Sequence, residues 1–264
     1  MGTAIIDGLI ANGMNPSNIS TLTNTAYSAE KLIAKYPVNA FSLEEDGAST
    51  LKAAANADVI ILAAKPYLIV ESIAQLVEPH LNKDALFISV AAGITCATIE
   101  SALPLGNPVV RAMPNTPAIV GKAVTGISAG SRANEQHLAL AVELFESIGK
   151  TLVLDESRID ALSTISGSGP AYVFFLVEKF IEAARHQGFS DEEARLLVNE
   201  TFLGSIDLLL ASGKSPQELR RQVTSPNGTT MQAIARMEEA DLGRVFAEAT
   251  DAALARAREI ATGK

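Results

Sequence analysis

The sequence is poor in the residues that build covalent cross-links, metal centres and hydrolytic sites. It contains a single cysteine, Cys96, and three histidines, His80, His137 and His186. One cysteine excludes an internal disulfide bond, and the histidines are too scattered for metal-ligand spacing, so we expect no bound metal. Because nothing near Cys96 in the sequence would activate a thiolate, we interpret it as a small filler residue. No Ser-His-Asp set for nucleophilic catalysis can be argued either.

An excess of positive charge and a long apolar run are absent as well. The net charge is −9 and the sequence pI is about 4.9, and no cluster of Lys or Arg is available to neutralise phosphates. These features exclude a nucleic-acid partner. No run of about 18 apolar residues would span a bilayer. The amino terminus also lacks the basic and apolar regions of a signal peptide, so we expect a cytoplasmic protein without a membrane partner.

What the sequence does contain is enough apolar material for two packed domains, since 48% of its 264 residues are hydrophobic and 19% are charged. Up to about residue 155, short apolar runs alternate with helical patterns. This alternation is typical of a mainly parallel sheet covered by helices. The runs cover residues 19–22, 38–41, 59–63, 86–91, 109–112, 124–128 and 152–154.

Strand-like runs stop after residue 158, and helical patterns follow. We predict helices over residues 170–186, 192–211, 216–222, 230–239 and 242–261. Ser190 with Glu193, and Ser215 with Glu218, have the spacing of a capping box at a helix start. We therefore place a domain boundary near residue 156, between a sheet domain over residues 1–156 and an all-helical domain over residues 157–264.

An apolar stripe runs along the second predicted helix of this helical domain. It consists of Phe202, Ile206, Leu209 and Leu210, and the hundred or so residues of the domain do not obviously cover it. Association of two or more chains through the helices follows as a hypothesis, with a monomer as the alternative.

The segment 223–230, Val-Thr-Ser-Pro-Asn-Gly-Thr-Thr, is the most informative in the chain. It separates two helical patterns, the second of which is marked by Met231, Ile234 and Met237 at helical spacing. Free backbone N–H groups around Gly228 and Thr230 would face whatever lies before the second helix, where the helix dipole favours negative charge. The segment therefore predicts a site for a carboxylate or phosphate, and an ordinary turn between helices is the alternative.

Two more segments have the same character. In residues 166–172, Ser-Gly-Ser-Gly-Pro-Ala-Tyr, Pro170 suits a first helical turn, and the Ser and Gly residues before it would leave backbone donors free. Residues 111–118, Arg-Ala-Met-Pro-Asn-Thr-Pro-Ala, follow a short apolar run, so their polar groups would lie at the carboxyl end of a strand. Three such segments in one chain argue against ordinary turns.

Together these segments resemble pyrroline-5-carboxylate reductase, a family of enzymes that make proline by reducing a cyclic imine. The resemblance covers nearly the whole chain and includes Ala64-Lys65-Pro66 after one strand and residues 89–93 after the next, in the family's order. Its most specific part is the carboxy-terminal signature of Pro216, Leu219, Val223, Ser225, Gly228, Thr230 and Ile234. The family's Gly-Gly pair is Asn227-Gly228 here, a mild departure because Asn also tolerates left-handed backbone.

The resemblance implies a fold, a reaction and an assembly. The fold is a Rossmann-like NAD(P)-binding domain over residues 1–156, followed by a helical dimerisation and substrate-binding domain over residues 157–264. The reaction is the reduction of 1-pyrroline-5-carboxylate to L-proline by hydride transfer from NAD(P)H. The assembly is a homodimer or a higher homo-oligomer built from dimers.

The resemblance also implies a substrate site in the 223–230 segment. Ser225 and Gly228, with the backbone amides of Thr229 and Thr230, would bind the substrate carboxylate, which agrees with the anion site that the residues themselves predict. The Thr230 hydroxyl is placed, in the family, to hydrogen-bond the ring nitrogen, so Thr230 is the catalytic candidate. The alternative is that Thr230, near a helix start, bonds its own backbone.

For the cofactor, the resemblance implies contacts from Gly2, Asn24, Thr25, Ala64, Lys65, Pro66, Ala92, Gly93, Met113, Asn115 and Thr116. We assign Lys65 to cofactor binding only, because a Lys before Pro at a strand end usually keeps its ammonium in solvent. Asn24 and Thr25 end the strand where an NAD-preferring site usually has Asp or Glu, and no acid follows before Glu30. NADPH is therefore favoured over NADH, although no Arg stands there for the extra phosphate.

The amino terminus departs from the resemblance. The family begins with an apolar strand and a glycine-rich turn, whereas this sequence begins Met1-Gly2, with Gly2 matching the last glycine of that turn. The first strand and the two earlier glycines, which let backbone approach a pyrophosphate, are absent from the sequence. Because the first strand is central in a doubly wound sheet, we expect the polypeptide to start upstream.

Two other functions are kept as alternatives. A hydroxyacid dehydrogenase of related architecture would use a Lys on the first long helix, and Lys179 would have to serve without the Gly-rich approach of that family. A non-catalytic protein that binds proline-like ligands would account for the absent glycine-rich turn. Activity on hydroxyacids supports the first alternative, and micromolar NADPH binding counts against the second.

Overall fold

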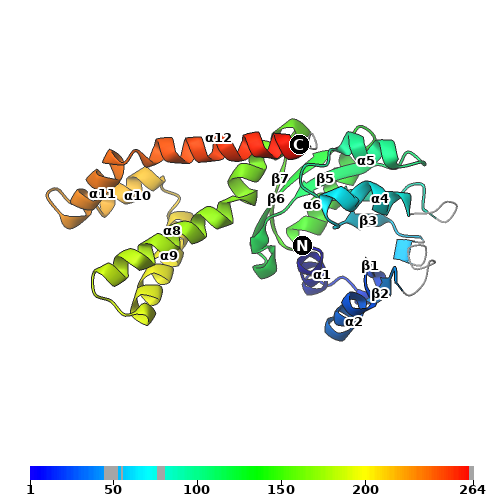
Figure 1. Ribbon diagram of the computed structural model, residues 1–264, viewed down its shortest axis with the longest axis horizontal. Helices are drawn as coiled ribbons and strands as arrows, with labels where there is room; N and C mark the ends of the chain where they lie inside the picture. Colours follow the sequence, from blue (N-terminus) through cyan, green and yellow to red (C-terminus); the bar gives the residue numbers. More distant parts are fainter. Residues whose placement is uncertain (45–52, 55, 76–80, 262–264) are drawn as a thin grey trace. The chain divides into compact units, whose positions relative to one another are not determined.

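The computed structural model describes residues 1–44, 53–54, 56–75 and 81–261 of the chain (Figure 1). The chain folds as two compact units. The first comprises residues 1–168 together with the chain from Leu254, and the second comprises Gly169–Ala253. The domain boundary near residue 156 stays a prediction, and the break between the compact units comes at Ser168.

The described strands form two sheets, both in the first unit. β1 and β2 are a parallel pair; in the second sheet β3, β4 and β5 are parallel, β6 joins β5 antiparallel and β7 pairs parallel with β6. Their bounds are β1 Ser20–Thr23, β2 Asn39–Ser42, β3 Val59–Leu62, β4 Leu86–Ser89, β5 Val109–Met113, β6 Ala123–Ala129 and β7 Gly149–Val153. The mainly parallel Rossmann-like sheet and the seven predicted runs are confirmed.

Helices cover both faces of the five-stranded sheet. On one face lie α1 (Gly2–Ala11) and α6 (Glu135–Glu146), and on the other lie α4 (Ile69–Ala74) and α5 (Cys96–Ala102). Successive residues of a strand serve opposite faces, as in β4, where Ile88 packs in the cluster of Phe145 and the neighbouring Phe87 in that of Ile73 and Ile99. Because both faces are covered, the strands read in the sequence as continuous apolar runs.

Helix α1 links the two sheets. Its Ala4 and Ile5 belong to the core of the five-stranded sheet, whereas Ile6 packs with Ile19 and Tyr36 beside the two-stranded sheet. Figure 1 shows α1 next to both sheets.

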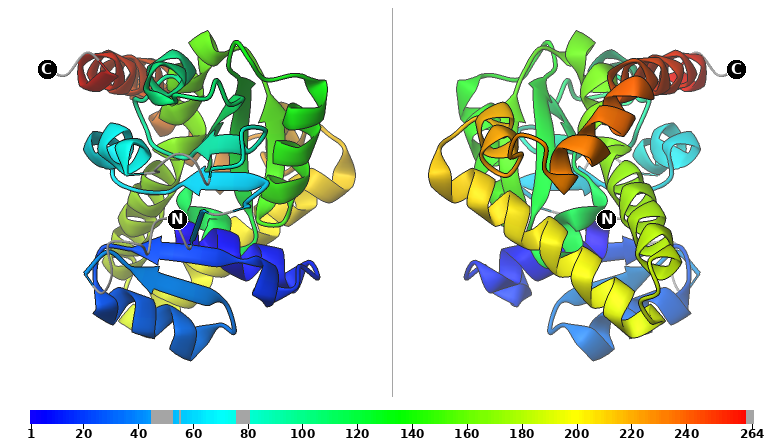
Figure 2. Two further views of the ribbon diagram at one scale, coloured as in Figure 1. Left: turned by 90° about the vertical axis from the view of Figure 1, so that its right-hand side faces the viewer. Right: turned by 90° about the vertical axis from the view of Figure 1, so that its left-hand side faces the viewer.

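The other helices of the first unit are short, and they connect or cover the strands. Figure 2 shows α2 lying against the two-stranded sheet, with which it is in contact. These elements are α2 Ala26–Lys35, α7 Ile159–Leu162, the 3-10 turns η1 Pro16–Asn18, η2 Pro66–Leu68, η3 Thr116–Val120 and η4 Glu156–Arg158, and the π-helix η5 Ser163–Gly167.

The second unit is helical, as predicted. Its helices are α8 Gly169–His186, α9 Asp191–Ser212, α10 Pro216–Gln222, α11 Thr229–Glu239 and the start of α12 Leu242–Ala261. Ser190 and Ser215 cap α9 and α10 through the predicted capping boxes. Among the described residues no single helix is long and apolar enough to cross a membrane, although the bent pair α9 and α10 meets the length and composition criteria together.

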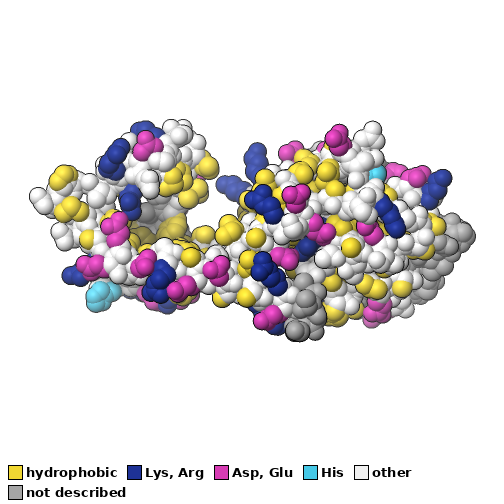
Figure 3. Space-filling view, turned by 90° about the horizontal axis from the view of Figure 1, so that it is seen from above, with side chains coloured by type: hydrophobic (Ala, Val, Ile, Leu, Met, Phe, Trp, Pro, Cys, Tyr) yellow, Lys and Arg dark blue, Asp and Glu magenta, His cyan; other side chains and the backbone are white. Residues whose placement is uncertain are grey.

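This helical unit has almost no core of its own. Ala194 and Val198 are its only buried hydrophobic residues among those the structure describes. Phe174 is 67% exposed and Leu210 is 77% exposed, and Figure 3 shows yellow hydrophobic side chains at the surface of these helices. An apolar face of this extent marks an interaction surface.

Candidate active site

Loops that follow β3, β4 and β5 meet at one edge of the five-stranded sheet, because these strands are parallel neighbours. They carry Ala64, Lys65 and Pro66 after β3, Ala92 and Gly93 after β4, and Met113, Asn115 and Thr116 at the end of β5. The Lys65 side chain is exposed and forms no ion pair with the residues that the structure describes. Open α/β sheets bind nucleotides at this carboxyl edge.

The start of α1 lies at the same edge. A Cβ added to Gly2 would stand 3.6 Å from the Cβ of Ala63, which directly follows β3. The α1 N-terminus has no side-chain cap and no acidic residue in its first turn. Its first N–H groups are therefore suited to an anion, so the residues present fit a dinucleotide pyrophosphate beside β3.

Asn24 and Thr25 follow β1, at the carboxyl edge of the two-stranded sheet. Thr25 Oγ1 accepts a hydrogen bond from the N–H of Ser28 at 3.2 Å and so caps α2. At the same helix start, Glu44 Oε2 accepts the N–H of Ala26 at 3.0 Å. Sequence reasoning missed Glu44, because it follows β2 rather than β1 and only strand pairing brings it there.

Asn115 connects three segments of the first unit. Its Nδ2 donates to the carbonyl oxygen of Ser166 at 2.8 Å, and its Oδ1 accepts the N–H of Val124 at 2.9 Å. The side chain is 8% exposed. Asn115 therefore holds the loop after β5 against both β6 and the π-helix η5.

The π-helix η5 packs under this loop. A Cβ on Gly167 would lie 3.4 Å from Met113 Cε, so the glycine leaves room for that side chain. The N–H of Ser168 donates to the carbonyl oxygen of Ser163 at 2.8 Å. The prediction that the residues before Pro170 leave backbone donors free is therefore wrong at Ser168, because the chain upstream is already helical. Single π turns are common at functional sites.

A buried ionic cluster braces β5 directly before the loop. Arg111 is 3% exposed, and its guanidinium contacts Asp160 at 2.8 Å and Glu156 at 3.6 Å. Glu156 Oε1 also accepts the N–H of Cys96 at 2.7 Å. Burial, followed by the charge of Glu156, raises the pKa of the Cys96 thiol to about 12. Cys96 is thus an inert, buried residue, as its interpretation as a filler requires.

The substrate turn predicted at residues 223–230 lies in the second unit, directly before α11. Asn227 has φ of 59°, the left-handed conformation expected when it replaces glycine. The N–H of Gly228 donates to the carbonyl oxygen of Ser225 at 3.0 Å, and a Cβ on Gly228 would clash with Ser225 Oγ. The turn is tight enough that residue 228 must be glycine for Ser225 Oγ to keep its position.

Several hydrogen-bond donors at this turn, apart from the N–H of Gly228, have no partner among the described residues. Helix α11 begins at Thr229 with Gly228 as N-cap, no side-chain cap and no acidic residue in its first turn. The hydroxyls of Ser225 and Thr230 form no hydrogen bond within the part of the chain that the structure describes, so Thr230 does not bond its own backbone. Free hydroxyls next to a bare helix N-terminus suit an anion.

Lys179, the candidate base of a hydroxyacid dehydrogenase, is a surface residue of α8. Its ammonium pairs with Glu182 at 2.8 Å and with Glu178 at 3.0 Å. These two hydrogen bonds raise its pKa, which is the opposite of what a catalytic base requires. Among the described residues, which exclude His80, no group of His, Cys, Asp and Glu could hold a metal ion.

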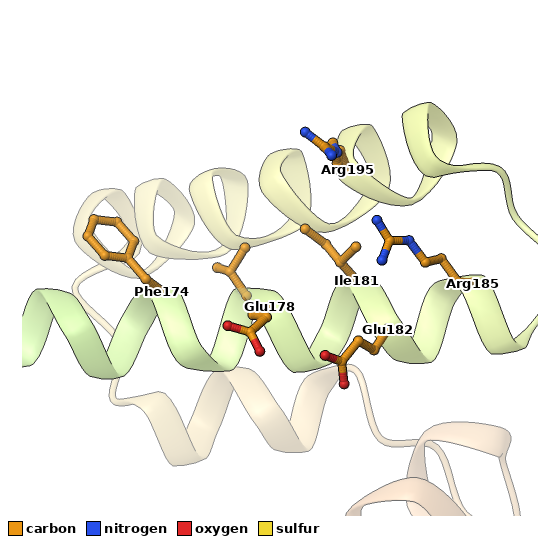
Figure 4. Close-up of a pocket in the computed structure, with 7 residues that line it drawn as sticks. Phe174, Glu178, Ile181, Glu182, Arg185 and Arg195 are labelled. Atoms are coloured by element: carbon orange, nitrogen blue, oxygen red, sulfur yellow. The ribbon is translucent and has the colours of Figure 1, made fainter.

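An open groove of about 290 Å³ lies between α8 and α9 (Figure 4). It is lined by Phe174, Val177, Glu178, Ile181, Glu182, Arg185 and Arg195, none of which is a predicted site residue. Arg185 is already paired with Asp191 at 2.6 Å. We assign the groove to the exposed apolar face of the helical unit rather than to the catalytic site.

Two family models match the chain. Residues 156–260 match the model described as pyrroline-5-carboxylate reductase dimerisation, and residues 1–93 match that of an NADP oxidoreductase, coenzyme F420-dependent. The pyrroline-5-carboxylate reductase of Corynebacterium melassecola is 36% identical, over 98% of this chain and 95% of the relative. That of Pseudomonas aeruginosa is also 36% identical, over 99% and 93%.

Solved structures agree with these matches. A pyrroline-5-carboxylate reductase from Coxiella burnetii superposes with a TM-score of 0.87 at 36% identity, covering 98% of this chain and 94% of its own. The pyrroline carboxylate reductase of Plasmodium falciparum, solved with NADP bound, superposes with a TM-score of 0.84 at 25% identity, covering 99% and 94%.

Proposed function

The chain belongs to the pyrroline-5-carboxylate reductase family, and we propose how its residues perform the family's reaction. It reduces 1-pyrroline-5-carboxylate to L-proline with NAD(P)H. The observation that carries the assignment of its substrate residues is the turn before α11, where a tight backbone, a bare helix N-terminus and free hydroxyls occur together.

Ser225, Thr229 and Thr230 bind the substrate carboxylate. Ser225 Oγ and the backbone N–H groups of Thr229 and Thr230 act as donors, and the missing Cβ of Gly228 lets the serine hydroxyl stay beside them. A carboxylate is the group that such donors and the helix dipole favour. This contact fixes one end of the imine ring and leaves the other end to the hydride donor.

Thr230 is the catalytic residue in this proposal. Its hydroxyl hydrogen-bonds the ring nitrogen, whose positive charge disappears as hydride arrives at the neighbouring carbon. A hydroxyl does this without titrating near neutral pH, so the contact steadies the developing amine at any working pH. Support comes from the absence of another partner for this hydroxyl within the described residues.

The carboxyl edges of the two sheets hold the cofactor, which supplies the hydride when bound. The first-turn amides of α1, beginning at Gly2, take the pyrophosphate. Around them lie the residues assigned to the same cofactor, Asn24, Thr25, Ala64, Lys65, Pro66, Ala92, Gly93, Met113, Asn115 and Thr116. The Asn115 side chain bonds Ser166 and Val124, so Asn115 positions the loop that carries Met113 and Thr116.

The chain forms a homo-oligomer, and we propose a dimer as its unit. The residues matched by the dimerisation model include all of α8 to α11, whose hydrophobic side chains are mostly exposed. A helical unit with two buried hydrophobic residues among those described requires a partner to cover it. A cytoplasmic location stays a prediction, which cell fractionation tests.

The test is the rate of NADPH and NADH oxidation by the purified chain when 1-pyrroline-5-carboxylate is added, with the effect of proline on its melting temperature. Turnover and stabilisation by proline are expected. Thr230→Val should lower kcat by about 100-fold and keep the stabilisation, because the carboxylate donors remain. Thr98→Val, on the exposed surface of α5, is the matched control. A folded chain that shows neither turnover nor stabilisation contradicts the proposal.

A further inference from the structure

Glu44 is an acidic residue at the carboxyl edge of the two-stranded sheet. β1 and β2 are parallel and in register, with Thr23 opposite Ser42, so the residues that follow them meet at one edge. The N–H of Leu43 donates to the carbonyl oxygen of Thr23 at 3.0 Å and continues the pairing beyond the strand. Two residues after β2, the Glu44 side chain therefore reaches the start of α2, which follows β1.

The position of Glu44 is well supported on both sides. Its N–H donates to the hydroxyl of the fully buried Ser42 at 3.1 Å, and its Oε2 accepts the N–H of Ala26, the first residue of α2, at 3.0 Å. Glu44 is exposed, and Oε1 has no hydrogen bond to the residues that the structure describes. One carboxylate oxygen thus anchors the side chain, and the other is left without a partner among the described residues.

From this geometry we propose that Glu44 discriminates NADH from NADPH in this chain and disfavours NADPH, which reverses the preference expected from Asn24 and Thr25 alone. In the dinucleotide fold, an acidic side chain at the end of the second strand accepts the ribose 2′-hydroxyl of NADH, and its charge repels the 2′-phosphate of NADPH. In this chain we take β1 as the counterpart of that strand, because it is followed by α2 and pairs in parallel with β2. Asn24 and Thr25, which follow β1, provide no acid, and Glu44 supplies it from the turn after the neighbouring strand β2.

Within residues 1–44, the few basic side chains already have partners. In residues 1–44, all of which the structure describes, Lys31 and Lys35 are the only basic side chains. Lys31 stacks over the ring of Tyr27 at 4.5 Å, and Lys35 pairs with Asp7 at 3.1 Å. A 2′-phosphate at this edge would therefore meet a carboxylate and no free lysine of α2. This inference rests on NAD(P)H as the cofactor and adds the group that selects between its two forms.

The test compares Glu44→Gln with Glu30→Gln in the full chain, without substrate. Glutamine at position 44 keeps an oxygen for the N–H of Ala26 and removes only the negative charge. Glu30, an exposed residue of α2, is the matched control. Dissociation constants for NADPH and NADH are measured by nucleotide fluorescence, and those for adenosine 2′,5′-bisphosphate and AMP by calorimetry. Glu44→Gln should lower the dissociation constants of NADPH and adenosine 2′,5′-bisphosphate about tenfold relative to those of NADH and AMP. This difference between the variant and the unmodified chain should become smaller in high salt.

An unchanged ratio in Glu44→Gln, an equal change in Glu30→Gln, or a folded protein that binds none of the four nucleotides overturns the inference. The outcome is separate from that of the proposed reaction. A chain that selects NADH through Glu44 and fails to reduce 1-pyrroline-5-carboxylate would retain this inference and refute the reaction. A chain that reduces the imine with unaltered cofactor selection in Glu44→Gln would do the reverse.

Discussion

Replacing Asn115 by alanine should loosen the loop after β5 and destabilise the first unit. The side chain bridges the carbonyl oxygen of Ser166 at 2.8 Å and the N–H of Val124 at 2.9 Å, and it is 8% exposed. Alanine removes both hydrogen bonds and brings no replacement. The carbonyl oxygen of the half-buried Ser166 and the N–H of Val124 then lose their partner.

The magnitude follows from those two groups. A shielded acceptor left without a partner costs about 1–3 kcal/mol, and the N–H of Val124 contributes less because this residue is 40% exposed and solvent replaces its partner. The expected loss in the free energy of unfolding is therefore about 2–4 kcal/mol. In a chain of this size each kcal/mol lowers the melting temperature by about 2–4 °C, so a decrease of at least about 4 °C is expected.

Urea and thermal unfolding of Asn115→Ala and Asn12→Ala provide the measurement. The Asn12 amide also makes two hydrogen bonds, to the carbonyl oxygens of Gly8 and Ser147, but the residue is exposed, so water replaces them. Asn12→Ala should therefore lower the free energy of unfolding by less than about 1 kcal/mol. If Asn115→Ala is no less stable than Asn12→Ala, the bridging role is refuted, and the side chain is then free to act on the cofactor directly.

Four further experiments test the site and the assembly. Arg111→Met leaves the carboxylate of Asp160 without its partner and should cost about 3 kcal/mol in urea unfolding; a loss below 1 kcal/mol would contradict a buried ionic brace. Gly228→Ala should weaken proline binding about tenfold with the melting temperature of the free chain nearly unchanged, because the new Cβ displaces the serine hydroxyl; equal proline binding speaks against the assigned carboxylate site. With its pKa raised to about 12, Cys96 should stay unmodified by a thiol reagent at pH 8 until the chain is unfolded; fast native labelling would show that it is neither buried nor protonated. Leu210→Glu should produce smaller particles in light scattering, since Leu210 is 77% exposed in the single chain; an unchanged particle size excludes it from the interface.

Local features were predictable from the residues. The apolar runs became strands because both faces of the sheet are covered, and Ser190 and Ser215 cap their helices because a capping box needs only residues three positions apart. The left-handed Asn227 and the bare start of α11 were also predictable, since backbone preference and chain direction decide them. These parts of the candidate site need no knowledge of the rest of the fold.

The π-helix at residues 163–167 shows where such reasoning fails. Pro170 marks a helix start in the sequence, yet the chain before it is already helical, and Ser168 bonds back to Ser163. Turn-forming Ser and Gly residues gave no sign of this conformation. The packing of Met113 against Gly167 and the bond from Asn115 to Ser166 accompany it, and both partners come from a distant strand end.

The sequence by itself therefore determined the strand and helix order, the helix caps, the tight turn before α11 and, through its signature, the family. Only the tertiary structure decided that Asn115 is a bridge, that Arg111 meets Asp160 across 49 positions and that Glu44 contacts the start of α2. The physical reason is the range of the interactions. Caps and periodicity act within one or two helical turns, whereas these contacts exist only after parallel strands bring the ends of separate loops to one edge.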